Sequence, residues 1–143
     1  MHLLINMQDP FLNKNTTFLR LLEEYRKYNS LVVAVDFDNT IYDFHKKGYT
    51  FPAVIDLLKE CNKVGFKVVI FTASPKERFD EIRQYCKDIG VFIDGINEEV
   101  IDSMKGGDRT NRKIYYNVLL DDRAGLGEAY EVLYNMINLK VTR

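Results

Sequence analysis

The chain has 143 residues, of which 46% are hydrophobic and 29% are charged, and its formal net charge is −1. That length suits one compact domain, and the nearly neutral charge excludes a general electrostatic attraction to nucleic acids or membrane surfaces. An anionic ligand would therefore have to be held by a local group of basic side chains.

The beginning of the chain predicts a helix rather than a targeting segment. The residues MHLLINMQDPF contain no basic stretch ahead of an apolar one, so they indicate neither a signal peptide nor a membrane span, and we expect a cytoplasmic protein. Residues 14–29 have helical spacing of apolar side chains. The apolar face would be made by Phe18, Leu21, Leu22, Tyr25 and Tyr28. We expect residues 1–30 to be a helical extension packed on the core.

The first strand is expected at residues 31–35, LVVAV. An uninterrupted apolar run of this length is typical of a central parallel strand that is buried on both faces. The polar pattern DFDNT follows directly and contains Asp36, Asp38 and Thr40. Carboxylates at the end of a buried strand require an explanation beyond packing.

A helix and a second strand follow. The helix is expected where apolar residues recur at helical spacing, at Val54, Leu57, Leu58 and Cys61. Gly65 would form its carboxyl-terminal cap. Residues 66–71, FKVVIF, then predict a second buried strand, which is followed by Thr72.

The next helix is expected to begin at a capping box. Residues 74–77, SPKE, would provide Ser74 as the cap and Pro75 at the first helical position. The core face of this helix would contain Phe79, Ile82, Cys86 and Ile89. Gly90 would end it, and residues 91–94, VFID, predict a short third strand.

The last third of the chain predicts a loop, a strand and a helix. The polar segment 97–112 contains Gly106 and Gly107 and is expected to be mainly loop. Residues 116–120, YNVLL, predict a strand that ends at Asp121, Asp122 and Arg123. The final helix would bury Leu126, Tyr130, Leu133 and Ile137.

Strands that alternate with helices predict an α/β domain over residues 31–143. We expect a three-layer, Rossmann-like parallel sheet with helices on both faces. Ligands of such folds bind outside the carboxyl ends of the strands, so the polar residues that follow each strand should meet at one edge. Crowded carboxylates would repel one another unless a cation joined them, and oxygen ligands of this kind favour Mg²⁺.

These residues resemble the motifs of the haloacid dehalogenase (HAD) superfamily of phosphohydrolases. The sequence DFDNT, residues 36–40, is similar to its Asp-x-Asp-x-Thr motif, although Asn39 stands where many members have glycine. Thr72 matches its second motif, and Asp121-Asp122 matches its acidic pair. Lys113 is the better match to the motif lysine, and Lys105 is the second candidate.

The resemblance implies a role for each of these residues. Asp36 would attack phosphorus and carry a covalent phosphoryl group, and Asp38 would act as general acid and base. Thr72 would bind a phosphoryl oxygen, while Lys113 would neutralise charge. Metal ligands would come from the Asp36 side chain, the Asp38 carbonyl and Asp122, with Asp121 in support.

The resemblance also implies a small enzyme without a large cap domain. About thirty residues separate Thr40 from Thr72, and the expected helix and strand use most of them. An open site suits a nucleotide, a polynucleotide end or another large phosphomonoester, and a homo-oligomer would supply a lid. The sequences TASP and LLDDR are similar to motifs of deoxyribonucleotide 5′-nucleotidases, and DDR is also similar to one in polynucleotide kinase-phosphatases.

Other functions remain open at this point. A phosphate-accepting signalling domain also gathers aspartates, a hydroxyl and a lysine around Mg²⁺, but its acidic pair comes first along the chain. A catalytically silent binding domain would be expected to lack one aspartate of the first motif, and both are present. Cys61 and Cys86 are expected to be buried and reduced, and too few soft ligands exist for a zinc site.

Overall fold

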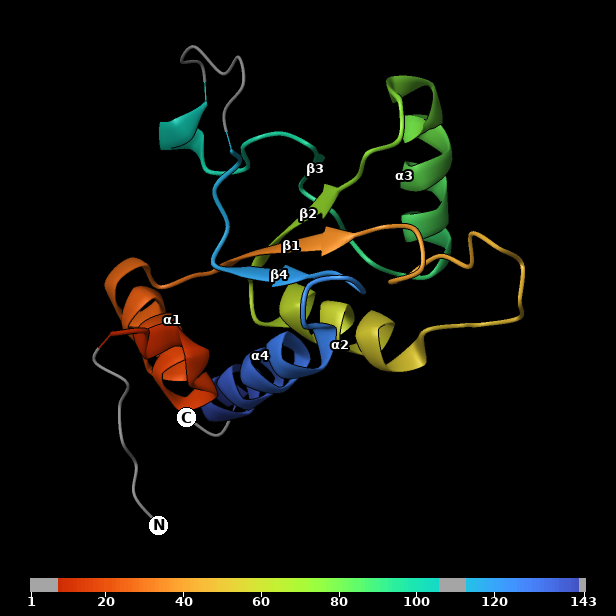
Figure 1. Cartoon of the computed structure of the whole chain (residues 1–143). Coiled ribbons are helices and arrows are strands. Elements are labelled where there is room, and N and C mark those ends of the chain that lie inside the picture. Colours follow the sequence, from red (N-terminus) through yellow and green to blue (C-terminus); the bar gives the residue numbers. More distant parts are fainter. Residues whose placement is uncertain (1–7, 106–112, 142–143) are drawn as a thin grey trace.

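A parallel sheet forms the centre of the protein. The computed structural model describes residues 8–105 and 113–141 (Figure 1). Its four strands are β1 (Val32–Asp36), β2 (Lys67–Phe71), β3 (Gly95–Ile96) and β4 (Val118–Leu120), in the order β3-β2-β1-β4. All neighbouring strands are parallel. The prediction of an α/β fold around a parallel sheet is therefore confirmed.

The register of the sheet aligns the carboxyl ends of its central strands. Val35 of β1 lies opposite Ile70 of β2 and Leu120 of β4. Asp36 is the last residue of β1 and lies opposite Phe71. The residues that follow these strands consequently start from the same edge of the sheet.

Each face of the sheet is covered by a different layer. The α-helices are α1 (Lys14–Tyr28), α2 (Pro52–Lys63), α3 (Phe79–Asp88) and α4 (Leu126–Val141). Figure 1 shows α1, α2 and α4 gathered on one side of the sheet. All four α-helices contribute to one hydrophobic cluster with Val33 and Val35. The helical members include Leu21, Leu58, Ile82 and Leu133.

The opposite face is covered by short and extended segments. Val32, Ala34 and Val69 form a second cluster with Val100. The flanking segments include the short 3-10 helix η3 (Asp102–Met104). Both faces of β1 are therefore buried, as its uninterrupted apolar run predicts. The residues between Thr40 and Thr72 form a loop, α2 and β2, without a cap domain.

The predicted third strand is placed wrongly. Residues 91–94 are not a strand, and β3 consists of Gly95–Ile96. The reason is the side chain of Asp94, whose Oδ2 accepts the backbone N–H of Val68 at 2.8 Å. A carboxylate thus takes the place of a backbone carbonyl, and regular pairing begins one residue later.

The predicted start of the third α-helix is also wrong. Pro75 is extended, the 3-10 helix η2 (Lys76–Arg78) follows it, and α3 begins only at Phe79. Ser74 makes no capping bond to the backbone, because its Oγ accepts a hydrogen bond from Arg78 Nη1 at 2.8 Å. The bond to Arg78 thus replaces the helix cap that the local sequence predicts for Ser74.

The other predictions on the helices and cysteines agree with the structure, except that Tyr28, expected on the apolar face of the first helix, is 62% exposed. Gly65 follows Val64, the C-cap residue of α2, and has a φ of +85°, as expected of a glycine that ends a helix. Cys61 and Cys86 are buried free thiols. Burial raises the pKa of Cys61 to about 12 and that of Cys86 to about 11. Among residues 8–105 and 113–141, no helix combines the length and apolar character needed to cross a membrane.

Candidate active site

A tight turn carries the first polar motif away from β1. The backbone N–H groups of Thr40, Ile41 and Tyr42 all point to the carbonyl of Phe37. Asn39 has a φ of +64°, in the left-handed region that glycine adopts most easily and asparagine tolerates. This backbone conformation explains why asparagine fits where the resemblance led us to expect glycine.

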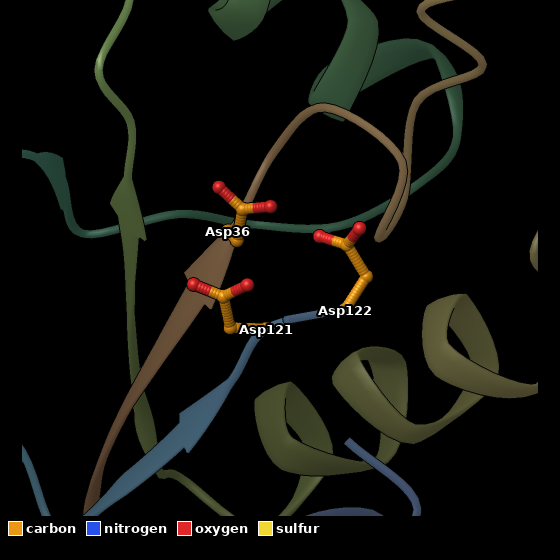
Figure 2. A group of neighbouring side chains, drawn as sticks. All are labelled: Asp36, Asp121 and Asp122. Atoms are coloured by element: carbon orange, nitrogen blue, oxygen red, sulfur yellow. The ribbon is translucent and has the colours of Figure 1, made fainter. Parts of the chain in front are cut away.

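Three carboxyl groups meet at the carboxyl end of the sheet. Oxygens of Asp36, Asp121 and Asp122 lie within 4.8 Å of one another. Figure 2 shows Asp36 at the end of β1 and the other two aspartates just beyond β4. The parallel register brings them together although about 85 residues of sequence separate them.

Thr40 holds two of these carboxyl groups in place. Its side chain is completely buried. The hydroxyl lies 3.2 Å from Asp36 Oδ2 and 3.2 Å from Asp122 Oδ1, and its oxygen accepts the backbone N–H of Asp122 at 3.0 Å. The threonine of the first motif is therefore a structural link between β1 and the acidic pair.

The crowding changes the ionisation of Asp36. Burial, a hydrogen bond with the Asp122 carboxyl and the negative charge of Asp121 together raise the pKa of Asp36 to about 7, against the smaller lowering effect of Thr40. Such repulsion is what a divalent cation among the oxygens would relieve. The donor set consists only of carboxylate oxygens, which suits Mg²⁺ or another hard cation.

Thr72 lies beyond β2 and is held by a side chain that directly follows the neighbouring strand β3. Asn97 Oδ1 accepts the backbone N–H of Thr72 at 2.9 Å, and Asn97 Nδ2 donates to the Thr72 carbonyl at 2.7 Å. The Thr72 hydroxyl oxygen accepts the N–H of Ser74 at 3.0 Å. Its hydroxyl hydrogen is thus available as a donor to a ligand.

Asp38 is paired with an arginine that the sequence analysis did not identify. Arg78 Nη1 lies 2.8 Å from Asp38 Oδ2, and both side chains are largely shielded from solvent. The hydrogen bond to Asp38 stabilises the protonated form of Arg78 and raises the pKa of that guanidinium. Nothing in the sequence distinguishes Arg78 from Arg83, since the pairing depends on where η2 sits.

A cavity of about 600 Å³ joins most of these residues. Its lining includes Asp36, Asp38, Thr72, Arg78, Asp121 and Asp122. The aromatic side chains of Phe44 and His45, from the loop after the first motif, contribute another part of the wall. The sequence-predicted aspartates and threonine are therefore brought to one concave surface.

The two lysine candidates occupy different places. Lys113 lines an adjacent cavity of about 450 Å³ together with Asp36, Thr72 and Asp121. Lys105 forms an ion pair with Asp102 at 3.1 Å and lines neither of these two cavities. Geometry therefore favours Lys113, whose ammonium group lies 5.3 Å from the centre of the Tyr116 ring.

Comparison with known proteins gives a likeness of fold. A solved structure described as the conserved protein coded by a locus from Bacteroides thetaiotaomicron is 23% identical to this chain, with a TM-score of 0.59. The match covers 76% of this chain and 93% of that one. No family model matches the chain, and neither does any curated protein. The similarity supports the Rossmann-like α/β architecture described above.

Proposed function

We propose that the protein is a Mg²⁺-dependent phosphomonoester hydrolase that acts through a phosphorylated aspartate. The observation that carries this proposal is the meeting of Asp36, Asp121 and Asp122 on one cavity with Asp38 and Thr72. A nucleophile, an acid or base, a hydroxyl donor and a cation site are the parts that phosphoryl transfer requires.

Asp36 and Asp38 would carry out the two chemical steps. In the first, Asp38 enters the step protonated; an Asp36 oxygen bonds to phosphorus as the ester oxygen departs, and Asp38 gives that oxygen its proton. In the second, Asp38 takes a proton from water, the water oxygen bonds to phosphorus, and the bond to Asp36 breaks. An alcohol and inorganic phosphate leave, and both aspartates return to their starting states.

The surrounding residues would bind the phosphoryl group. The Thr72 hydroxyl would donate to a phosphoryl oxygen, and Lys113 would offset negative charge between Asp36 and Asp121. Asp36, the Asp38 carbonyl and Asp122 would hold Mg²⁺, with Asp121 in support. The cation, when bound, would neutralise charge on the carboxylates and on the transferring phosphate.

The cavity favours a phosphomonoester whose remainder extends to the solvent. The absence of a cap domain between Thr40 and Thr72 leaves the 600 Å³ cavity open to a large leaving group. A nucleotide and a polynucleotide end remain the substrate classes to test first, on the sequence similarities of TASP and LLDDR.

The decisive experiment measures phosphate release with and without Mg²⁺. The substrates are 4-nitrophenyl phosphate, 5′- and 3′-nucleotides and a 3′-phosphorylated oligonucleotide, and Asp36→Asn is assayed beside the wild type. Mg²⁺-dependent release that disappears in Asp36→Asn supports the proposal. Activity that persists in Asp36→Asn would contradict it. A stable phosphorylated Asp36 without release of phosphate would instead support the signalling alternative. The absence of any phosphorylation would support a silent binding domain.

A further inference from the structure

The guanidinium group of Arg78 connects the loops that follow the two central strands. Its Nη1 donates to Asp38 Oδ2 and to Ser74 Oγ, at 2.8 Å in each case. Asp38 follows β1 and Ser74 follows β2, whereas Arg78 ends η2 just before α3. One side chain therefore fixes the relative position of three segments around the cavity.

Aromatic rings hold this guanidinium in place. The Cζ atom of Arg78 lies 5.5, 5.4 and 5.6 Å from the ring centres of Phe37, Tyr42 and Phe44. Phe37 and Tyr42 are stacked at 5.0 Å. Tyr85 of α3 packs edge-on against both rings and donates its hydroxyl to the carbonyl of Ile41 at 2.6 Å. A planar cation among packed rings has little freedom to reorient.

The two oxygens of Asp38 have contrasting surroundings. Oδ2 is paired with Arg78, whereas Oδ1 is buried and has no hydrogen-bond partner in the described part of the chain. Among the described residues, the contact at Oδ2 is thus the hydrogen bond that orients this carboxyl group. Without the arginine, Asp38 would rotate to find partners for both oxygens.

We propose that Arg78 is the positioning residue of Asp38. The rings fix the guanidinium, and the guanidinium fixes the carboxyl group in the orientation from which it serves the ester oxygen. The inference rests on the proposed function, in which Asp38 gives a proton to that oxygen. Arg78 itself contacts no reacting atom in this assignment, so its effect passes entirely through Asp38.

The leaving group of the substrate separates this role from a purely structural one. A nitrophenolate leaves without being protonated, whereas the oxygen of an alkyl ester needs a proton as its bond to phosphorus breaks. The ratio kcat/KM reports the steps through formation of phosphorylated Asp36. A misplaced Asp38 therefore lowers kcat/KM for an alkyl phosphate more than for an aryl phosphate.

The experiment compares 4-nitrophenyl phosphate with glycerol phosphate in the presence of Mg²⁺. Arg78→Met should lower kcat/KM for the alkyl ester about a hundredfold and for the aryl ester less than about fivefold. Arg78→Lys, which keeps the charge without the planar group, should fall between Arg78→Met and the wild type. Asp38→Asn should show the same selective loss as Arg78→Met.

Arg83→Met is the matched control. Arg83 lies on α3, five residues after Arg78, forms an ion pair with Asp80 at 3.3 Å and lies 5.9 Å from the Phe79 ring centre, but it does not line the cavity around Asp36. Its loss should leave both kcat/KM values unchanged. Circular dichroism melts of all variants confirm folding at the assay temperature, and Arg78→Lys carries the comparison if Arg78→Met is unfolded.

The outcomes separate the two proposals. Equal losses for both esters in a folded Arg78 variant would overturn the positioning role, and so would kinetics like those of Arg83→Met. Selective loss of the alkyl ester supports it. Failure of the wild type to release phosphate from these two esters and from the nucleotides and oligonucleotide named above, or full activity in Asp36→Asn, would overturn the hydrolase and with it the role of Arg78.

Discussion

The two ends of the parallel sheet differ in how their polar groups are paired. At the amino end, Asn117 Oδ1 accepts the backbone N–H of Val32 at 2.7 Å, and its Nδ2 donates to Glu24 and to the Tyr115 hydroxyl at 2.9 Å each. At the carboxyl end, three carboxyl groups face one another. One end pairs a neutral amide with complementary partners, and the other concentrates like charges.

The comparison indicates that the amino end of the sheet contributes mainly to stability and the carboxyl end mainly to chemistry. Complementary hydrogen bonds around a partly buried amide strengthen the fold. Carboxylates within 4.8 Å of one another weaken it unless a cation is bound. Changes at the amino end should therefore alter the free energy of unfolding, and changes at the carboxyl end should alter turnover.

The largest effect is expected from Asp36→Asn. An amide is a poor nucleophile, so phosphate release should fall by about a thousandfold or more. Steady-state phosphate release measures this loss, and circular dichroism shows whether the fold is kept. Activity of the variant within tenfold of the wild type would show that Asp36 is not the nucleophile. The contrast between the two ends of the sheet would then no longer hold.

Asn117→Ala should have its main effect on stability. The substitution leaves the Val32 N–H without its acceptor, which costs about 1–3 kcal/mol of unfolding free energy. Urea unfolding measures the loss. At temperatures where the variant is folded, kcat should stay at the wild-type value, and a selective fall in kcat with unchanged stability would reverse the assignment of the two ends.

Asn97→Ala should reduce turnover about tenfold, because Thr72 would lose both backbone bonds that hold it at the cavity. Asn62→Ala is the matched control. The Asn62 amide makes the same pair of bonds to Phe92, at 2.8 and 3.0 Å, in a region away from the cavity. Asn97 has a φ of +53°, in the left-handed region where alanine is strained, so thermal melts should show the larger destabilisation in Asn97→Ala. At temperatures where both variants are folded, only Asn97→Ala should lower kcat. Equal kcat values would show that the Thr72 backbone needs no such support.

The smallest effect concerns pH and metal. Folding raises the pKa of Asp36 from 3.8 to about 7, so the folded protein keeps a proton that the unfolded chain has released. In EDTA, Tm should therefore fall by a few degrees as the pH rises from about 5 to about 8. Mg²⁺ should raise Tm most at the upper end of that range.

Scanning fluorimetry measures these Tm values. Asp36→Asn should flatten the pH dependence of Tm. An equal slope in that variant would assign the pH dependence to other groups.

The sequence allowed the main parts of the site to be predicted because they follow from local patterns and one topological rule. The apolar run before Asp36 identifies a buried parallel strand, and parallel strands bring Thr72 and Asp121 to the same edge. Arg78 and Asn97 could not be predicted, because their roles depend on contacts across the fold. Asp94 was misread because its side chain bonds to the backbone of a distant strand, and Ser74 because its hydroxyl accepts a bond from the Arg78 guanidinium instead of capping a helix.

The alignment of β1 with β4 has a consequence for changes in chain length. Val35 lies opposite Leu120, so Asp36 and Asp121 both occupy the position after this pair, Asp36 at the end of β1 and Asp121 just beyond β4. Deleting one residue within either strand would move its aspartate out of step and turn alternate side chains to the other face. Extra residues in the loop between Asp43 and Phe51 would shift neither strand and would add little closure entropy. Homologues can therefore be expected to vary in length at that loop and to keep the spacing within β1 and β4 fixed.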